Sequence, residues 1–192
     1  MHSIRNYDAF TGLEAAIVLV AFVIVASVFS FAVLGVGFFT TQKSQEVVYN
    51  GVEGASSSLQ LTGDVYGVGI TGVEIEMVNF SVSLASGSFP IDFEKVVITY
   101  SNATQMETLH PVTGIRSTST TGRTWAILSA PSETGNSNNL LEKGEQFMIS
   151  VHPSWGIPKN SDLSIVIKPS VGATMEIKRS APSAVNTVNL LY

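Results

Sequence analysis

Few residues of this chain have the types and spacing that catalytic chemistry requires. Glu74 and Glu76 are two positions apart in an alternating segment, so they share one face of a strand. Paired carboxylates can act in glycoside hydrolysis or bind calcium, but far more often they form a solvated strand face. His110 and His152 each precede a proline at expected strand ends, without a nucleophile elbow or a phosphate-binding glycine loop. We therefore expect no catalytic site, no enzyme activity and no cofactor.

The composition of the 192 residues excludes several further classes. The chain has no cysteine, which rules out disulfides and thiolate metal sites, and its three histidines make a histidine-rich metal site improbable. Fifteen acidic residues against ten basic ones give a net charge of −5, which disfavours nucleic acid as a partner. Charged residues make up only 13% of the chain, about half the usual share for a soluble domain.

Two sequons could accept an N-linked glycan in an extracellular domain. They are Asn79-Phe80-Ser81 and Asn102-Ala103-Thr104. Asn102 follows an expected strand and is placed in a turn, which makes it the better acceptor. Asn79 falls inside a strand pattern, where it is explained equally well as an outward-facing polar residue.

Glu14 stands at the start of a long apolar run. A carboxylate near hydrocarbon is costly unless it is hydrated at headgroup level or paired with a positive group. A cut just before Phe10 would create an α-amine four residues from Glu14, and the two groups could pair within one chain or between neighbouring chains. Without such a cut, simple hydration is the favoured explanation.

The element next to Glu14 is an uncharged run from Ala15 to Gln42. It is apolar on every side and longer than the roughly 20 residues that cross a bilayer, so it predicts a membrane segment rather than a buried helix of a soluble domain. A removable secretory signal is the alternative, with Gly35 and Gly37 imitating a cleavage region, but such signals have shorter apolar stretches.

The pattern after this run predicts that the helix continues and then breaks. Apolar residues recur every three or four positions as far as Leu59, so we expect one helix over residues 10–61. Four glycines then predict a flexible joint over residues 62–72.

The pattern from residue 73 to residue 192 changes to short alternating segments separated by Gly, Pro, Ser and Asn. Such segments predict an antiparallel β-sandwich, so the fold class is α+β, with a long N-terminal apolar α-helix before an immunoglobulin-like sandwich. A polar loop is expected over residues 131–139. The expected strands are 73–86, 91–101, 123–129, 145–153, 163–169, 173–179 and 185–191.

The first 50 residues resemble the amino terminus of archaeal flagellins (archaellins), which share the type IV pilin plan. The resemblance rests on FTGLEAAIV at residues 10–18, on the apolar helix after it, and on GFFTTQKSQE at residues 37–46. The β-rich remainder agrees in character only, including EKGEQF at residues 142–147.

This resemblance implies a structural subunit of the archaellum, a rotating helical filament used for swimming. A membrane-bound prepilin-type peptidase would remove residues 1–9, cutting between Ala9 and Phe10 and making Glu14 the fifth mature residue. The chain departs from many archaellin leaders in having Asn6-Tyr7-Asp8-Ala9, without Lys or Arg, before the cut. The helix would lie in the membrane before assembly and in the filament core afterwards, packed against copies of itself. The sandwich would form the extracellular, often N-glycosylated surface, and other proteins would provide the export and motor machinery.

Two other functions remain open at this stage. An archaeal adhesion pilin has the same leader, helix and sandwich, although residues 38–46 favour the archaellin. A membrane-anchored binding ectodomain would need a flexible linker after the helix and a concave polar site.

Overall fold

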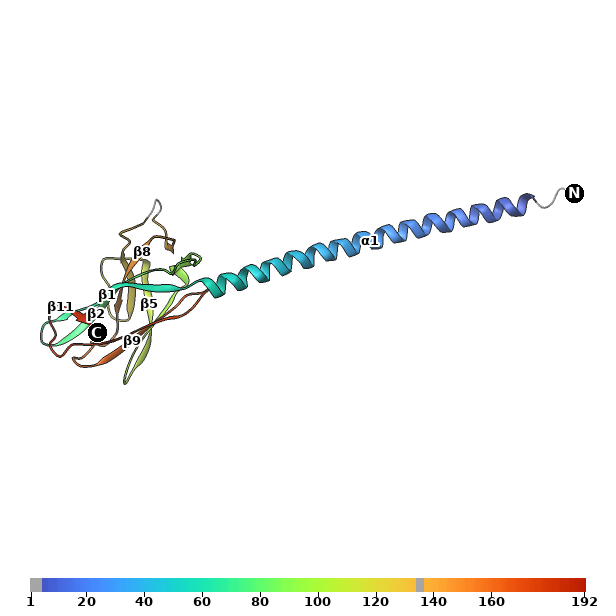
Figure 1. Ribbon diagram of the computed structural model, residues 1–192. Coiled ribbons are helices and arrows are strands. Elements are labelled where there is room, and N and C mark those ends of the chain that lie inside the picture. The colour runs from blue at the N-terminus through green and yellow to red at the C-terminus, as the bar shows by residue number, and fades with distance from the viewer. Residues whose placement is uncertain (1–4, 134–136) are drawn as a thin grey trace. The chain divides into compact units, whose positions relative to one another are not determined.

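The computed structural model describes residues 5–133 and 137–192, with side chains from residue 11 onward. The chain divides into two compact units, Met1–Asn50 and Gly51–Tyr192. The described part of the first unit, from Arg5 on, is helical, and the described part of the second contains the end of the same helix and the strands. Figure 1 shows the helix as one unbroken element.

Helix α1 extends over Arg5–Ser56, so the expected end at residue 61 is wrong. The sequence explains the earlier stop, since Ser56, Ser57 and Ser58 favour caps and turns over helix interiors. Beyond them Leu59 and Leu61 pair with Leu84 and Val82 of a neighbouring strand. The last apolar residues of the helical pattern, Leu59 and Leu61, are therefore paired in a sheet and are not part of the helix.

The turn from helix to strand is held by several hydrogen bonds within the second unit. The Ser88 hydroxyl donates to the Ser56 carbonyl at 3.0 Å and accepts from the Ser58 N–H at 3.2 Å. The Ala173 N–H donates to the Ser57 carbonyl at 2.8 Å. Satisfied backbone groups fix the chain direction here, which is the opposite of a flexible linker.

The expected glycine joint at residues 62–72 is also wrong, because most of it belongs to strand β1, Leu59–Ile70. The glycines of this segment allow a close approach between strands and a tight turn. A Cβ on Gly69 would lie 2.2 Å from the Glu74 carbonyl oxygen, and Gly72 has a φ of +79° in the turn to the next strand. The sheet domain therefore starts at Leu59 rather than at residue 73.

The remaining strands follow the expected segments closely, but two strands, β5 and the short β7, were not predicted. A 3₁₀ turn over Phe93–Lys95 also interrupts the expected strand 91–101. The strands after β1 are β2 (Glu74–Leu84), β3 (Ile91–Asp92), β4 (Val97–Asn102), β5 (Met106–Arg116), β6 (Thr124–Ser129), β7 (Leu140–Leu141), β8 (Gln146–His152), β9 (Asp162–Lys168), β10 (Met175–Ser180) and β11 (Val188–Leu191).

Nine strands form one sheet in the order β10-β9-β4-β5-β6-β8-β2-β1-β11, and β3 and β7 form a separate pair. Strand β5 joins the two halves, pairing first with β4 and then, from His110 on, with β6. The β5–β6 pairing is parallel, so the sheet is mostly rather than wholly antiparallel. Ser180 and Tyr192 exchange backbone hydrogen bonds of 2.6 and 3.4 Å, which joins the two ends of the sheet.

The sheet encloses one apolar core. Phe93 packs edge-on against Phe147 and Trp125, with ring centroids 5.3 and 6.4 Å apart. The core is lined by alternating strand residues such as Val78, Phe80 and Val82 of β2, which are 0–1% exposed. The fold is therefore a long apolar helix followed by a mostly antiparallel sheet around its own core, as the sequence predicts.

Candidate functional site

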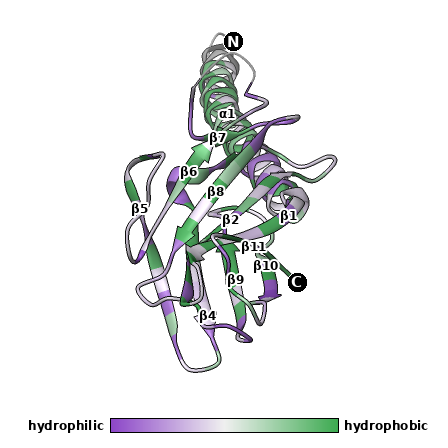
Figure 2. Ribbon diagram, turned by 90° about the vertical axis from the view of Figure 1, so that its left-hand side faces the viewer, coloured by the Kyte–Doolittle hydropathy of each residue, from purple (hydrophilic) through white to green (hydrophobic). Residues whose placement is uncertain are grey.

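The largest unusual feature of the chain is the exposed apolar surface of α1. Every residue from 11 to 50 is exposed, including Leu13, Phe22, Phe31 and Phe39, which are 61–80% exposed. Figure 2 shows the hydrophobic colouring of this helix. A monomeric soluble protein rarely exposes so much continuous apolar surface, so this helix must be covered by lipid or by other protein.

Three hydroxyl groups within the apolar stretch are satisfied by the helix itself. Ser27 donates to the Ile24 carbonyl at 2.8 Å, and Thr40 and Thr41 donate to carbonyls four residues earlier, both at 2.9 Å. A hydroxyl that donates to a carbonyl of its own helix needs no polar partner outside the helix. The surface therefore fits hydrocarbon, or the apolar side chains of other helices, equally well.

Charged residues limit this surface at both ends. Glu14 is exposed at the start, and Lys43 and Glu46 form an exposed ion pair of 2.6 Å after the end. The uncharged stretch between them is about 42 Å long at about 1.5 Å per residue, which exceeds the roughly 30 Å of hydrocarbon in a bilayer. The described helix over Thr11–Ser56 is long and apolar enough to cross a membrane by length and composition.

The residues of the expected processing site lie at the start of this helix. The backbone of Ala9 and Phe10 is helical, and their side chains lie outside the described part of the chain. Glu14 lies in the next helical turn after Phe10, because an α-helix has 3.6 residues per turn.

Asn102 ends β4 and begins a tight turn, as the sequence predicts. Its Oδ1 accepts the Thr104 N–H at 2.9 Å, the Gln105 N–H at 2.8 Å and the Thr104 hydroxyl at 3.1 Å. This Asx turn leaves the amide nitrogen of Asn102, which is the atom that a glycan would modify, free of the bonds that hold the turn. The turn also borders a shallow depression lined by Asp162, Lys178 and Tyr192.

Asn79 occupies a very different position, in the middle of β2. It pairs with Tyr66 of β1 on one side and with Ser150 of β8 on the other. Its Oδ1 atom is buried and has no hydrogen-bond partner. A glycan has much less room here than at Asn102.

The structure does not gather the other candidate residues into a catalytic site. Glu74 and Glu76 lie near the start of β2, and the described residues contain no group of three His, Asp or Glu side chains that could hold a metal. His152 ends β8, with its Nδ1 3.1 Å from the Thr120 carbonyl. His110 lies within β5 rather than at a strand end, because β5 continues past its proline.

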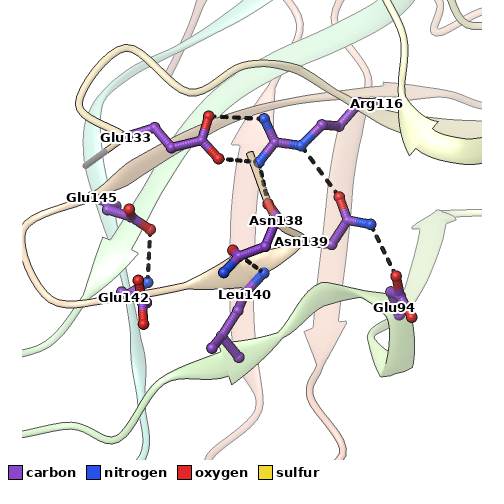
Figure 3. Close-up of polar contacts among 8 residues, drawn as sticks. All are labelled: Glu94, Arg116, Glu133, Asn138, Asn139, Leu140, Glu142 and Glu145. Carbon is purple, nitrogen blue, oxygen red and sulfur yellow. Dashed lines mark hydrogen bonds and ion pairs between the residues drawn. The ribbon is translucent and has the colours of Figure 1, made fainter. Parts of the chain in front are cut away.

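A polar cluster around Arg116 was not foreseen from the sequence (Figure 3). Arg116 binds both oxygens of Glu133, at 2.6 and 3.0 Å, and donates to the side-chain oxygen of Asn139 at 3.2 Å. Gly114 and Ile115 precede it with φ values of 82° and 62°, where the pairing of β5 with β6 is irregular. The partners are 17–23 residues away in sequence, so no local pattern could have identified the cluster.

Comparison with known proteins identifies the family. The model of archaeal-type flagellin matches residues 9–179. Probable flagellin 1 of Archaeoglobus fulgidus is 37% identical over 199 aligned positions, which cover 100% of this chain and 98% of the relative.

The solved structures that resemble the chain include two archaeal flagellin structures. The archaeal flagellum of Methanospirillum hungatei has a TM-score of 0.69 and 31% identity, over 94% of this chain and 99% of that one. An archaeal flagellin crystal structure from Methanocaldococcus jannaschii shares the fold, with a TM-score of 0.61 and 19% identity over 70% of this chain and 96% of that one. The exposed apolar helix and these matches agree: the chain belongs to the archaeal-type flagellin family and is a structural subunit of a filament.

Proposed function

We propose that the chain forms the core and surface of a rotating archaellum filament used for swimming, and that its role is structural rather than enzymatic. The observation that carries this proposal is the uncharged surface of α1 from Ala15 to Gln42, whose Ser27, Thr40 and Thr41 hydroxyls are satisfied internally. Such a helix is stable in lipid and among copies of itself. Transfer from one to the other exposes little apolar surface to water.

In this proposal the precursor lies in the membrane and a prepilin-type peptidase removes residues 1–9. The new α-amine at Phe10 is then about 6 Å along the helix axis from Glu14, because four residues each rise about 1.5 Å. The amine and the carboxylate pair within one chain or between neighbours, which neutralises both charges as the helix end leaves water. Export and motor proteins then deliver and turn the extracellular filament.

Sheared surface filaments provide the direct test of this processing. We expect intact-mass measurement and amino-terminal sequencing to give a chain that begins at Phe10. A chain that begins at Met1 would instead indicate a membrane-anchored ectodomain. A chain that begins after about Gly37 would indicate a secretory signal and would end the filament proposal.

Swimming is tested by producing this chain in archaeal cells that lack their own flagellins. We expect filaments and restored swimming, and a Glu14→Ala variant should be membrane-inserted but poorly assembled. Filaments that support attachment but never swimming would favour an adhesion pilin.

The same filaments test glycosylation. We propose that Asn102, in its exposed Asx turn, carries the glycan and that Asn79, with its buried Oδ1, does not. Added mass should appear on the Asn102 peptide and disappear in Thr104→Ala. The matched variant Ser81→Ala should change nothing, and added mass on the Asn79 peptide would contradict the assignment.

A further inference from the structure

One outward face of the sheet is apolar, although none of the residues that the structure describes covers it. We call this the outer apolar face, formed by strands β1, β2 and β11. Cross-strand neighbours on it are Tyr66 with Leu190, and Val68 with both Val188 and Met77. Tyr66, Ile70, Val188 and Leu190 are 38–60% exposed, whereas the alternate residues of these strands face the core. Its members are Tyr66, Val68, Ile70, Met77, Val188 and Leu190.

The outward face of β4, β5, β9 and β10 has a different character. It carries Ser and Thr side chains and the four charged residues Asp162, Lys168, Glu176 and Lys178, with Val97, Val166 and Met106 between them. Lys178 pairs with Glu176 at 3.3 Å, and Ser164 donates to Glu176 at 2.8 Å. These are the features of a face in water. On the β1–β2–β11 side, Asp64 and Glu76 lie at the register shifts, and the polar neighbours within the face are Glu74, which pairs with Ile70, and Asn79, which pairs with Tyr66.

The position of strand β11 is a further reason to expect that another molecule covers this face. It lies at one end of the strand order, where its ladder partner is β1 and only Tyr192, the residue after it, bonds to Ser180 of β10. An end strand with exposed apolar residues is an aggregation hazard in a free secreted domain. A chain with such a strand is expected to keep it against a fixed neighbour.

We propose that the outer apolar face is a lateral contact with the sheet domain of a second copy in the filament. This inference rests on the proposed function. Each α1 helix carries one sheet domain, so packing of the helices in a filament places the sheet domains of neighbouring copies near one another. The effective concentration of one sheet domain around the next is then about millimolar or more. The Methanospirillum filament structure, which this chain matches over 94% of its length, includes the sheet region as well as the helix. In a helical polymer the contact is heterologous, so the outer apolar face meets a different surface of its neighbour and the interface repeats without closing.

The absence of cysteine allows a direct test on full-length filaments. Val188→Cys places one thiol on the outer apolar face, and Thr108→Cys places one on the polar face; both positions are exposed strand residues. Each variant is produced as a minority among wild-type subunits, so that filament formation does not depend on it. The measurement is the rate of maleimide labelling in intact filaments and in subunits dissociated from them.

We expect labelling of Val188→Cys to be at least about tenfold slower in filaments than in dissociated subunits. The reason is that maleimide can reach a thiol buried in a contact only while that contact is transiently open. Thr108→Cys should react at similar rates in both. A second variant, Leu190→Cys, should behave as Val188→Cys does. Equal labelling of both face variants in filaments and subunits would overturn this contact while leaving the filament function intact. Failure of the wild-type chain to form filaments would instead contradict the proposed function.

Discussion

Arg116 holds Glu133 through two parallel hydrogen bonds, Nη1 to Oε2 at 3.0 Å and Nη2 to Oε1 at 2.6 Å. The two side chains are 29% and 16% exposed, so water screens the pair only partly. The guanidinium also lies 5.5 Å from the ring centroid of Phe147 and donates to the Asn138 carbonyl. One side chain thereby joins β5 to the described ends of the polar loop and to the core.

Replacing Arg116 should therefore destabilise the sheet domain measurably. Arg116→Ala leaves Glu133 half-buried without its partner, and we expect a loss of about 2 kcal/mol in the free energy of unfolding. Thermal unfolding of the full chain, followed by the fluorescence of buried Trp125, measures it. The control Lys95→Ala removes an ion pair of 2.8 Å whose lysine is 68% exposed and should barely move the midpoint. Equal effects of the two variants would contradict the assigned role of Arg116.

A charge in the middle of the apolar stretch should prevent filament formation. Val28→Asp places a carboxylate near the centre of the uncharged residues, where an Asp costs about 2.5–3.5 kcal/mol in a bilayer. The control is Val48→Asp, which lies beyond Lys43 and has the same 65% exposure in the isolated chain. We expect normal filament counts by electron microscopy for Val48→Asp and almost none for Val28→Asp. Abundant Val28→Asp filaments would show that the stretch does not form a dry core.

The close approach at Gly69 should make this position intolerant of a side chain. In Gly69→Ala the new Cβ would lie 2.2 Å from the Glu74 carbonyl oxygen and 2.6 Å from the Ile75 Cα, so the backbone must move. We expect a loss of about 1–3 kcal/mol in unfolding free energy. Gly122→Ala is the control, because its nearest neighbour would be 3.8 Å away. An unchanged midpoint for Gly69→Ala would mean that β1 is the flexible joint after all.

Alkaline pH should weaken the sheet domain through Tyr100. Burial raises the pKa of Tyr100 above its ordinary value of 10.0, so the folded chain keeps the phenolic proton after the unfolded chain has lost it. The stabilising effect is complete below pH 10 and is lost as pH rises through the folded pKa, at most about 1.4 kcal/mol per pH unit.

The measurement is the unfolding midpoint of the full chain between pH 8 and pH 11. We expect Tyr100→Phe to show a shallower alkaline decline than the wild type. Tyr192→Phe alters a tyrosine that is 76% exposed and should follow the wild-type curve. Identical slopes for all three chains would exclude Tyr100 as the titrating group.

The helix, the β-rich domain and the family can all be predicted from the sequence. The absence of charge from Ala15 to Gln42 is a property of composition, and it requires an apolar environment in any fold. Strand alternation likewise places Val78, Phe80 and Val82 inside without knowledge of their partners. The sequence also predicts the turn at Asn102, because the segment before it has the pattern of a strand.

Features that depend on pairing between residues far apart in the sequence could not be predicted in this way. The segment after Ser56 continues the helical pattern, but in the structure it forms β1. The reason is that β2 and β11 provide hydrogen-bond partners for its backbone, and a local helical pattern contains no information about such distant partners. The glycines that suggested a joint instead let Ile75 and the Glu74 backbone approach closely. Arg116 finds Glu133 only once β5 and the polar loop come together. The outer apolar face exists only because β11, from the far end of the sequence, is paired beside β1, where cross-strand register and not local pattern sets which side chains meet.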